Sequence, residues 1–186
     1  MKIKNTSERF GIIAIVLHWL MALLIIGMLA IGLYMINLPN GLEKLKFYGW
    51  HKEYGLLILS LAIVRITWRM INSTPALLLP WWEKLAAYSV HWAFYGFMFA
   101  MPITGWLISS AAGIRVSFFG IFTLPNLIAP DQQWLNFFAW CHEWLAYALI
   151  ATILLHIIAA LKHHFINKDD ILRRMMPLKS SVFLKK

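Results

Sequence analysis

The sequence predicts an all-α integral membrane protein, a single domain in which four transmembrane helices form one bundle. Of its 186 residues, 61% are hydrophobic and only 13% are charged, whereas an ordinary soluble domain has about 25% charged residues. One core cannot hide that much apolar surface, which excludes a soluble enzyme. A chain with 15% aromatic residues does not stay solvated as a disordered protein either.

Four apolar segments are long enough to cross a bilayer, since a spanning helix needs about 20 apolar residues. They cover residues 10–36, 51–70, 85–110 and 135–161 of the single domain 1–186. Turn chemistry at Leu38-Pro39-Asn40-Gly41 ends the first segment, and Pro102 predicts a kink in the third. Residues 113–134 are apolar but interrupted by Gly and Pro, which predicts an interfacial loop, and residues 162–186 form a basic tail.

The distribution of Lys and Arg predicts the orientation of the chain. Thirteen of the 17 basic residues fall on the side that holds both termini, and four fall on the other side: Lys44, Lys46, Lys52 and Arg115. Basic loops stay in the cytoplasm, so both termini are expected there. The net charge of +9 then reflects topology and contact with the anionic lipid of the bilayer, and we expect no nucleic-acid partner.

Five of the seven histidines lie in or at the ends of the spans, where ionisable residues are rare and usually functional. These five are His18, His51, His91, His142 and His156. A single membrane histidine is usually a hydrogen-bonded packing residue, whereas five need a common cause.

The spacing of the histidines suggests that cause. His142 and His156 are 14 residues apart, which places them on one helix face about 21 Å apart. They cannot share a metal ion at that distance, but each can ligate a separate haem. His18 lies near the depth of His156, and His51 near the depth of His142. The sequence therefore predicts two bis-imidazole sites, His18–His156 and His51–His142, and filled axial positions favour electron transfer over oxygen binding.

The only cysteine, Cys141, excludes an internal disulfide and a CxxCH site for covalent haem. Two further residues repeat the 14-residue offset. Gly32 follows His18 and is a candidate to pack against a haem, or to serve as a simple helix contact. Arg65 follows His51 and is a candidate partner for a haem propionate, or a residue that extends to the lipid headgroups.

The remaining histidines have weaker assignments. His91 reaches the layer of His18 and His156, and we expect it to hydrogen-bond a propionate, a quinone or a neighbouring helix rather than to ligate. His163 and His164 lie beyond the last span and are expected at the surface.

Short motifs in every span and in the tail are similar to those of one known family. They are Leu17-His18-Trp19, Trp50-His51 before Gly55, Val64-Arg65 with Arg69, Pro102-Ile103-Thr104-Gly105-Trp106, Cys141-His142-Glu143, Leu155-His156, Lys162-His163-His164-Phe165 and Leu172-Arg173-Arg174-Met175-Met176-Pro177. Over essentially its whole length the chain resembles the bacterial di-haem cytochrome b561 family, which is related to the cytochrome b subunits of hydrogenases and formate dehydrogenases. The resemblance implies a multi-pass protein of the bacterial inner membrane with two haem b groups, ligated at His18, His51, His142 and His156.

The resemblance also implies a membrane oxidoreductase of the superoxide:quinone type. An electron from a small anionic donor such as superoxide enters at the periplasmic haem, moves to the cytoplasmic haem and leaves to a membrane quinone of the ubiquinone type. Arg115 is a candidate anion contact that steers the donor by local positive potential, although four cations on one face are also ordinary.

Two alternative functions stay open. The first is a haem-containing electron-relay subunit that anchors a periplasmic dehydrogenase or another redox partner. The second is a metal or proton transporter that uses histidine relays, which fits less well because the spans hold no paired carboxylates and Glu143 stands alone in the last span.

Overall fold

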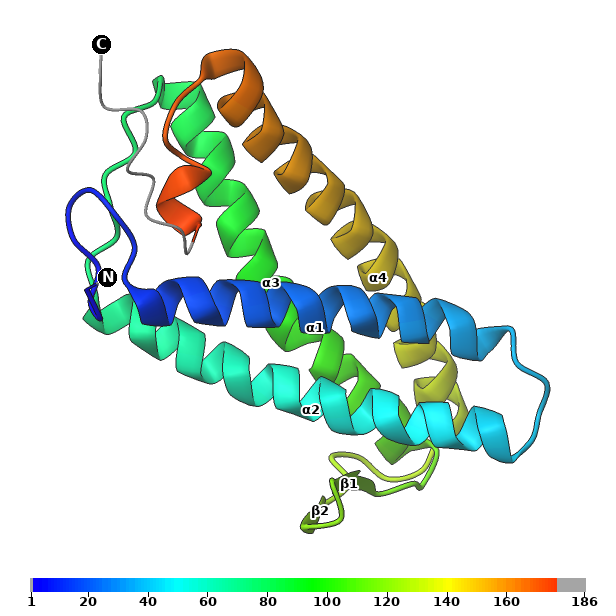
Figure 1. The fold of residues 1–186 in the computed structure, drawn as a ribbon. Coiled ribbons are helices and arrows are strands. Elements are labelled where there is room, and N and C mark those ends of the chain that lie inside the picture. The colour runs from blue at the N-terminus through cyan, green and yellow to red at the C-terminus, as the bar shows by residue number, and fades with distance from the viewer. Residues whose placement is uncertain (1, 177–186) are drawn as a thin grey trace.

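The computed structural model of the chain describes residues 2–176 and consists mainly of four long helices (Figure 1). They are α1 (Ile12–Ile36), α2 (Leu42–Ile71), α3 (Trp81–Ala111) and α4 (Gln132–Leu161). Each is long and apolar enough to cross a membrane, which confirms the predicted four-span bundle. Helices suit this role because they satisfy their own backbone hydrogen bonds. Pro177 and the tail lysines Lys179, Lys185 and Lys186 lie outside the described residues.

Three of the helices extend beyond the apolar segments that predict them. α2 begins at Leu42 rather than His51, because a helix can continue into the polar edge of a membrane. α3 begins directly after Pro80, where a proline is tolerated because the first backbone N–H groups of a helix have no partner within it. The Asp131 side chain caps α4 by accepting hydrogen bonds from the backbone N–H groups of Gln133 and Trp134.

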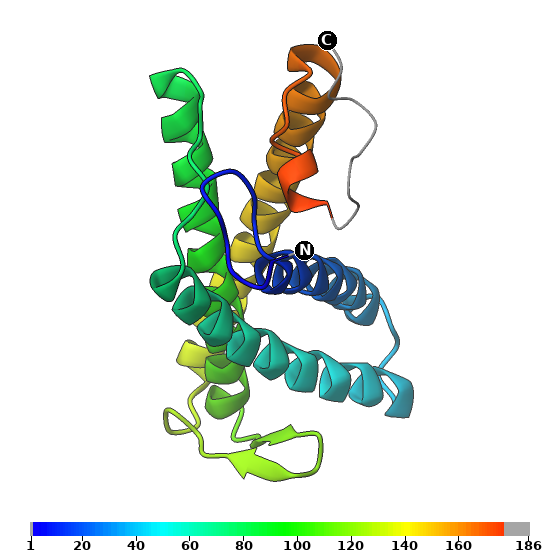
Figure 2. The ribbon, with the colours of Figure 1, turned by 60° about the vertical axis from the view of Figure 1, so that its left-hand side comes forward.

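The helices pack in chain order, α1 on α2, α2 on α3 and α3 on α4. Their shared core lies among α1, α2 and α3 and contains Met21, Ile58, Ala62, Tyr95 and Met98. α3 and α4 converge at one end of the bundle and separate toward the other (Figure 2). The functional side chains described below face one another between α4 and the α1–α2 pair.

A β-hairpin marks the end where α3 and α4 converge, which we call the hairpin end (Figure 2). Strands β1 (Val116–Phe118) and β2 (Phe122–Leu124) pair antiparallel. Phe119 and Gly120 make the turn with φ values of 50° and 72°. The segment 113–134 is therefore a hairpin followed by the start of α4 rather than a loop throughout.

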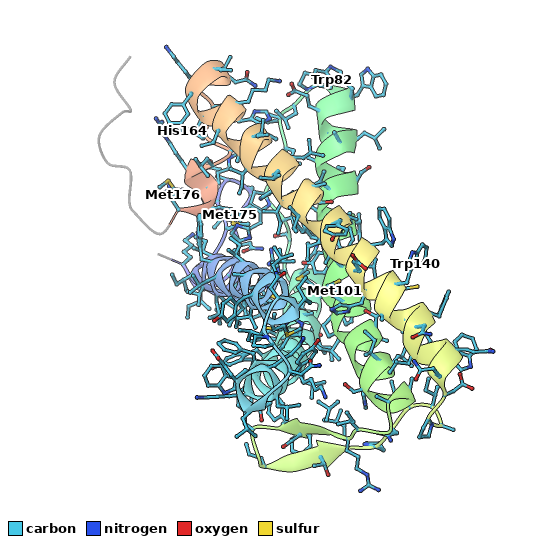
Figure 3. The ribbon with its side chains drawn as sticks, turned by 90° about the vertical axis from the view of Figure 1, so that its right-hand side faces the viewer. Trp82, Met101, Trp140, His164, Met175 and Met176 are labelled. Carbon is cyan, nitrogen blue, oxygen red and sulfur yellow. The ribbon has the colours of Figure 1, made fainter. Side chains whose placement is uncertain are left out.

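The opposite end, which we call the terminal end, brings residues 2–11 together with residues 162–176. The tail turns back after α4 through a π-helical turn (Lys162–Asn167) and a short 3-10 helix (Arg173–Met175). The Trp19 indole N–H donates to the Met175 carbonyl over 2.8 Å, and Arg174 donates to the Ala76 carbonyl over 2.8 Å. Figure 3 shows Met175 and Met176 beside the first turns of α1.

Candidate functional site: two facing histidine pairs

His51 of α2 and His142 of α4 face each other toward the hairpin end. Their ring centroids are 6.2 Å apart and their planes are inclined by 70°. Both rings line a cavity of about 460 Å³, to which all four helices and Val116 of β1 contribute lining residues. Pockets for small molecules and cofactors measure about 300–1,000 Å³, so this space is large enough for a ligand.

Thr104 of α3 orients the His142 ring. Its Oγ1 lies 2.9 Å from His142 Nδ1 and also donates to the carbonyls of Ala100 and Met101. The hydroxyl has a single proton, which those carbonyls accept, so it accepts a hydrogen bond from Nδ1–H. Nε2 of His142 is then the unprotonated nitrogen, the state that a metal ligand requires.

Two glycines give the imidazoles room at the same level. A Cβ on Gly32 of α1 would lie 3.4 Å from His51 Cε1, and one on Gly105 of α3 would lie 3.5 Å from His142 Cε1. Each ring therefore packs against bare backbone of a neighbouring helix. Gly32 also lines the cavity, at the level where the sequence places a haem contact.

The second pair lies toward the terminal end. His18 of α1 and His156 of α4 have ring centroids 6.2 Å apart and planes inclined by 66°. His91 of α3 is equally close to His156, with a centroid distance of 6.1 Å. Distance alone therefore gives His156 two neighbours, His18 across the gap and His91 on the adjacent helix.

Arg65 of α2 lies at the level of His18 and points into the bundle. Its Nη2 is 3.2 Å from His18 Nδ1, and its Nη1 is 3.9 Å from the sulfur of Met21. A guanidinium group only donates hydrogen bonds, so His18 Nδ1 accepts here. Arg115, in contrast, is exposed at the base of the hairpin and does not line the His51–His142 cavity.

The spacing of both pairs fits a haem iron held between them. Metal–imidazole bonds measure about 2 Å, and a ring centre lies about 1 Å beyond its nitrogen, so two imidazoles on opposite sides of one iron have centroids about 6 Å apart. Both observed distances are 6.2 Å. Among residues 2–176 no group of three or more His, Cys, Asp and Glu side chains could hold a bare metal ion. The residues present therefore fit haem, with one imidazole on each face.

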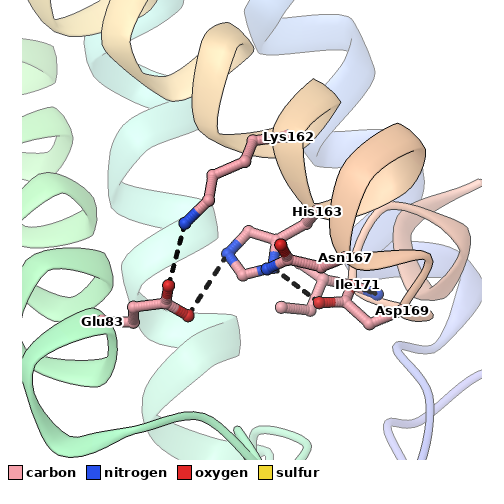
Figure 4. Close-up of polar contacts among 6 residues, drawn as sticks. All are labelled: Glu83, Lys162, His163, Asn167, Asp169 and Ile171. Atoms are coloured by element: carbon pink, nitrogen blue, oxygen red, sulfur yellow. Dashed lines mark hydrogen bonds and ion pairs between the residues drawn. The ribbon is translucent and has the colours of Figure 1, made fainter.

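A polar cluster joins the separated ends of α3 and α4 (Figure 4). Lys162 Nζ lies 3.0 Å from Glu83 Oε1, and His163 lies 2.6 Å from Asp169 and 4.0 Å from Glu83. The His163 side chain is only 12% exposed, so the expectation of a surface histidine is wrong for this residue. It is enclosed because the tail turns back over it.

Four apolar spanning helices that bring imidazoles face to face in pairs define a class of protein, the membrane-embedded haem proteins. The comparisons with known proteins are specific. The family model described as Prokaryotic cytochrome b561 matches residues 9–178, and the chain belongs to that family. It is therefore a multi-pass inner-membrane protein that binds b-type haem and transfers electrons across the membrane.

Three relatives match nearly the whole chain. Cytochrome b561 homolog 2 of Escherichia coli is 38% identical over 190 residues, covering 97% of this chain and 98% of the relative. The probable superoxide oxidase CybB of Yersinia pestis is 31% identical, covering 92% and 98%. Cytochrome b561 homolog 1 of Escherichia coli is 30% identical, covering 91% and 98%.

The sequence reasoning assigned no role to Thr104 and Gly105. Both lie on α3, the span from which no ligand is expected, so the histidine spacing gave no signal for them. Their position in the Pro102–Trp106 motif is the one sequence feature that singles them out.

Proposed function

We propose that the chain binds two b-type haems, one between His51 and His142 and one between His18 and His156, and passes electrons from a donor at the hairpin end to a membrane quinone. The observation that carries this proposal is the repeated 6.2 Å spacing of two imidazole pairs that share α4. A haem held between two imidazoles would supply one-electron transfer.

His18 is the better partner for His156 than His91. α3, which carries His91, packs directly on α4, whereas His18 approaches His156 from α1, just as His51 approaches His142 from α2. His18 would hold the haem through Nε2, and its Nδ1 would then carry the proton and no longer accept from Arg65. Arg65 would be free to bind a propionate, the role its position supports.

Superoxide is the proposed donor because one relative is a probable superoxide oxidase. Two superoxide anions and two protons then convert one quinone to quinol and release two oxygen molecules. Lys52 lines the cavity beside His51, and Arg115 is exposed nearby, so both can attract a small anion locally. The hairpin end also holds Glu43, Glu53, Asp131 and Glu143, which balance its four cations and limit any long-range steering.

The first experiment is a reduced-minus-oxidised spectrum of the purified chain, with haem quantified as pyridine haemochromogen. We expect about two non-covalent b haems per chain from two bis-imidazole sites. The variants His18→Ala and His142→Ala should each lose one haem, and His91→Ala should keep both. A wild type without haem would contradict the proposal, and loss of haem in His91→Ala but not in His18→Ala would reassign the ligand.

The second experiment supplies superoxide and a soluble ubiquinone analogue to the isolated protein. Rapid haem reduction followed by quinol formation supports the superoxide:quinone activity. If superoxide does not reduce the haems and a redox partner copurifies with the chain, the electron-relay subunit would be favoured instead.

A further inference from the structure

Arg65 and Arg69 form a pair of cations at the terminal end, and no carboxylate of the described residues pairs with them. They lie one turn apart on α2, and both guanidinium groups stand over the Tyr95 ring, at 6.0 and 5.7 Å from its centroid. An uncompensated cation pair inside a membrane bundle is costly, so an anion is expected beside it.

The surroundings of the pair are rich in donors. Trp68, between the two arginines in sequence, has a buried indole N–H without a hydrogen-bond partner among the described residues. A small pocket of about 40 Å³ is lined by both arginines and Trp68, and Met175 of the tail forms part of its wall. A buried donor without an acceptor is destabilising, so an acceptor that carries negative charge would be favourable beside these three donors.

The contact of Arg65 with His18 indicates the source of that anion. Arg65 Nη2 is 3.2 Å from His18 Nδ1, so the cation pair adjoins the site where the terminal-side haem is proposed to bind. The propionates are the charged groups of a haem b, and carboxylates match the paired donors of a guanidinium group.

We propose that Arg65, Arg69 and Trp68 bind the propionates of the terminal-side haem, and that this cation pair gives that haem a higher reduction potential than the hairpin-side haem. The inference rests on the proposed function, because it assumes two haems. Reduction adds one negative charge, and fixed positive charge in a medium of low dielectric constant stabilises the reduced form.

The hairpin-side site has no such excess of charge. Its cavity is lined by one cation, Lys52, and one carboxylate, Glu143, whose formal charges cancel. This difference in local charge favours electron transfer from the hairpin-side haem to the terminal-side haem. With the orientation predicted by the basic residues, electrons move from the periplasm toward the cytoplasm.

The test is a spectroscopic redox titration of the purified holoprotein. In the wild type we expect two transitions, and the one missing from His18→Ala should be the higher. Arg69→Gln and Arg65→Gln should shift that transition to lower potential and leave the other in place. Arg69→Lys, which keeps the charge, should shift it less. Arg9→Gln is the matched control, because the exposed Arg9 guanidinium group lies at the same end and, among the described residues, donates only to the Arg173 carbonyl.

A second arm tests the propionates directly. Arg69→Gln should retain the terminal-side haem less well than the wild type does during dilution in detergent. When both are reconstituted with haem dimethyl ester, which lacks the two carboxylates, this difference in haem retention should become much smaller. An unchanged difference would overturn the propionate contact. A transition that Arg69→Gln and Arg65→Gln do not move would mean that the arginines bind another anion, such as a lipid phosphate, and would overturn the inference.

The two proposals fail in different ways. Fewer than two haems per chain contradicts the proposed function. Two haems whose potentials have the reverse order contradict only the inference about Arg65 and Arg69.

Discussion

Single side chains around the imidazoles decide whether each ring is ready to hold iron. The Thr104 hydroxyl gives its proton to the α3 backbone and so accepts from His142. This fixes the tautomer of His142 before any cofactor binds. Thr104 lies on α3, which supplies no proposed ligand. It takes part in the site by orienting His142 of α4.

We expect Thr104→Val to weaken binding of the hairpin-side haem by about 10–100-fold, the usual cost of losing the partner that orients a metal-binding histidine. Valine keeps the shape of threonine but cannot accept the hydrogen bond from Nδ1. The measurement is haem retention during dilution in detergent. Thr152→Val is the control, since Thr152 donates only to the Ala148 carbonyl of its own helix. Equal haem retention in the two variants would contradict this role.

Gly32 supports a second prediction at the same scale. Alanine should be tolerated there, because its Cβ would lie 3.4 Å from His51 Cε1, an ordinary contact. Leucine should displace the His51 ring and abolish the hairpin-side haem while the terminal-side haem remains, as measured by haem per chain. Gly27→Leu on the same helix is the control, because nothing lies within 4 Å of a Cβ at Gly27. Two haems in Gly32→Leu would show that the ring has room to move.

At the scale of helices, α4 is the element that the proposed haem sites share. His142 and His156 occupy one of its faces, while α1 and α2 each supply one facing imidazole. α4 is held on α3 by direct packing at the hairpin end and by long polar side chains at the terminal end. Lys162 and His163 reach across to Glu83 where the two helices have separated (Figure 4).

Glu83→Gln should therefore loosen the terminal ends of α3 and α4. The Glu83 side chain is 12% exposed, and removing its charge from Lys162 should lower the stability by about 1–2 kcal/mol. The measurement is the apparent melting temperature in detergent. Asp170→Asn is a matched control, because the Asp170 carboxylate is 66% exposed and 3.4 Å from Arg173, and such surface pairs contribute little. The same melting temperature for both variants would mean that the cluster does not hold the helices together.

At the scale of the whole molecule, charge is divided between the two ends. The hairpin end has four cations and four carboxylates, so the net charge of +9 is carried by the rest of the chain. Positive loops stay on the cytoplasmic side. The charge asymmetry that predicts the orientation in the membrane therefore includes the arginine pair near His18.

The orientation has a direct test by cysteine labelling in intact cells. In a Cys141→Ser background, a cysteine at Gly120 in the hairpin turn should react with a membrane-impermeant maleimide applied from the periplasm. A cysteine at Lys168 in the tail should react only after the membrane is opened. The reverse pattern would invert the predicted orientation and, with it, the direction proposed for electron flow.

The sequence by itself determined the number of spans and the histidines that form the two facing pairs. Apolar segments of about 20 residues form spanning helices in lipid. An offset of 14 residues returns to the same helix face whatever the packing. Helix ends were less predictable, because α2 and α3 begin in polar, Pro-containing or Gly-containing sequence that local patterns assign to turns. The hairpin was missed because its strands are only three residues long.

Only the tertiary structure decided which groups meet across helices. Thr104 lies near His142, Arg65 near His18 and His91 near His156 because of the angles at which α1, α2 and α3 cross α4. Those angles come from side-chain packing over the whole bundle, which no local pattern encodes. The fold-back of the tail over His163 has the same origin. Spacing along one helix is fixed by backbone geometry, whereas contact between helices is fixed by how their surfaces fit together.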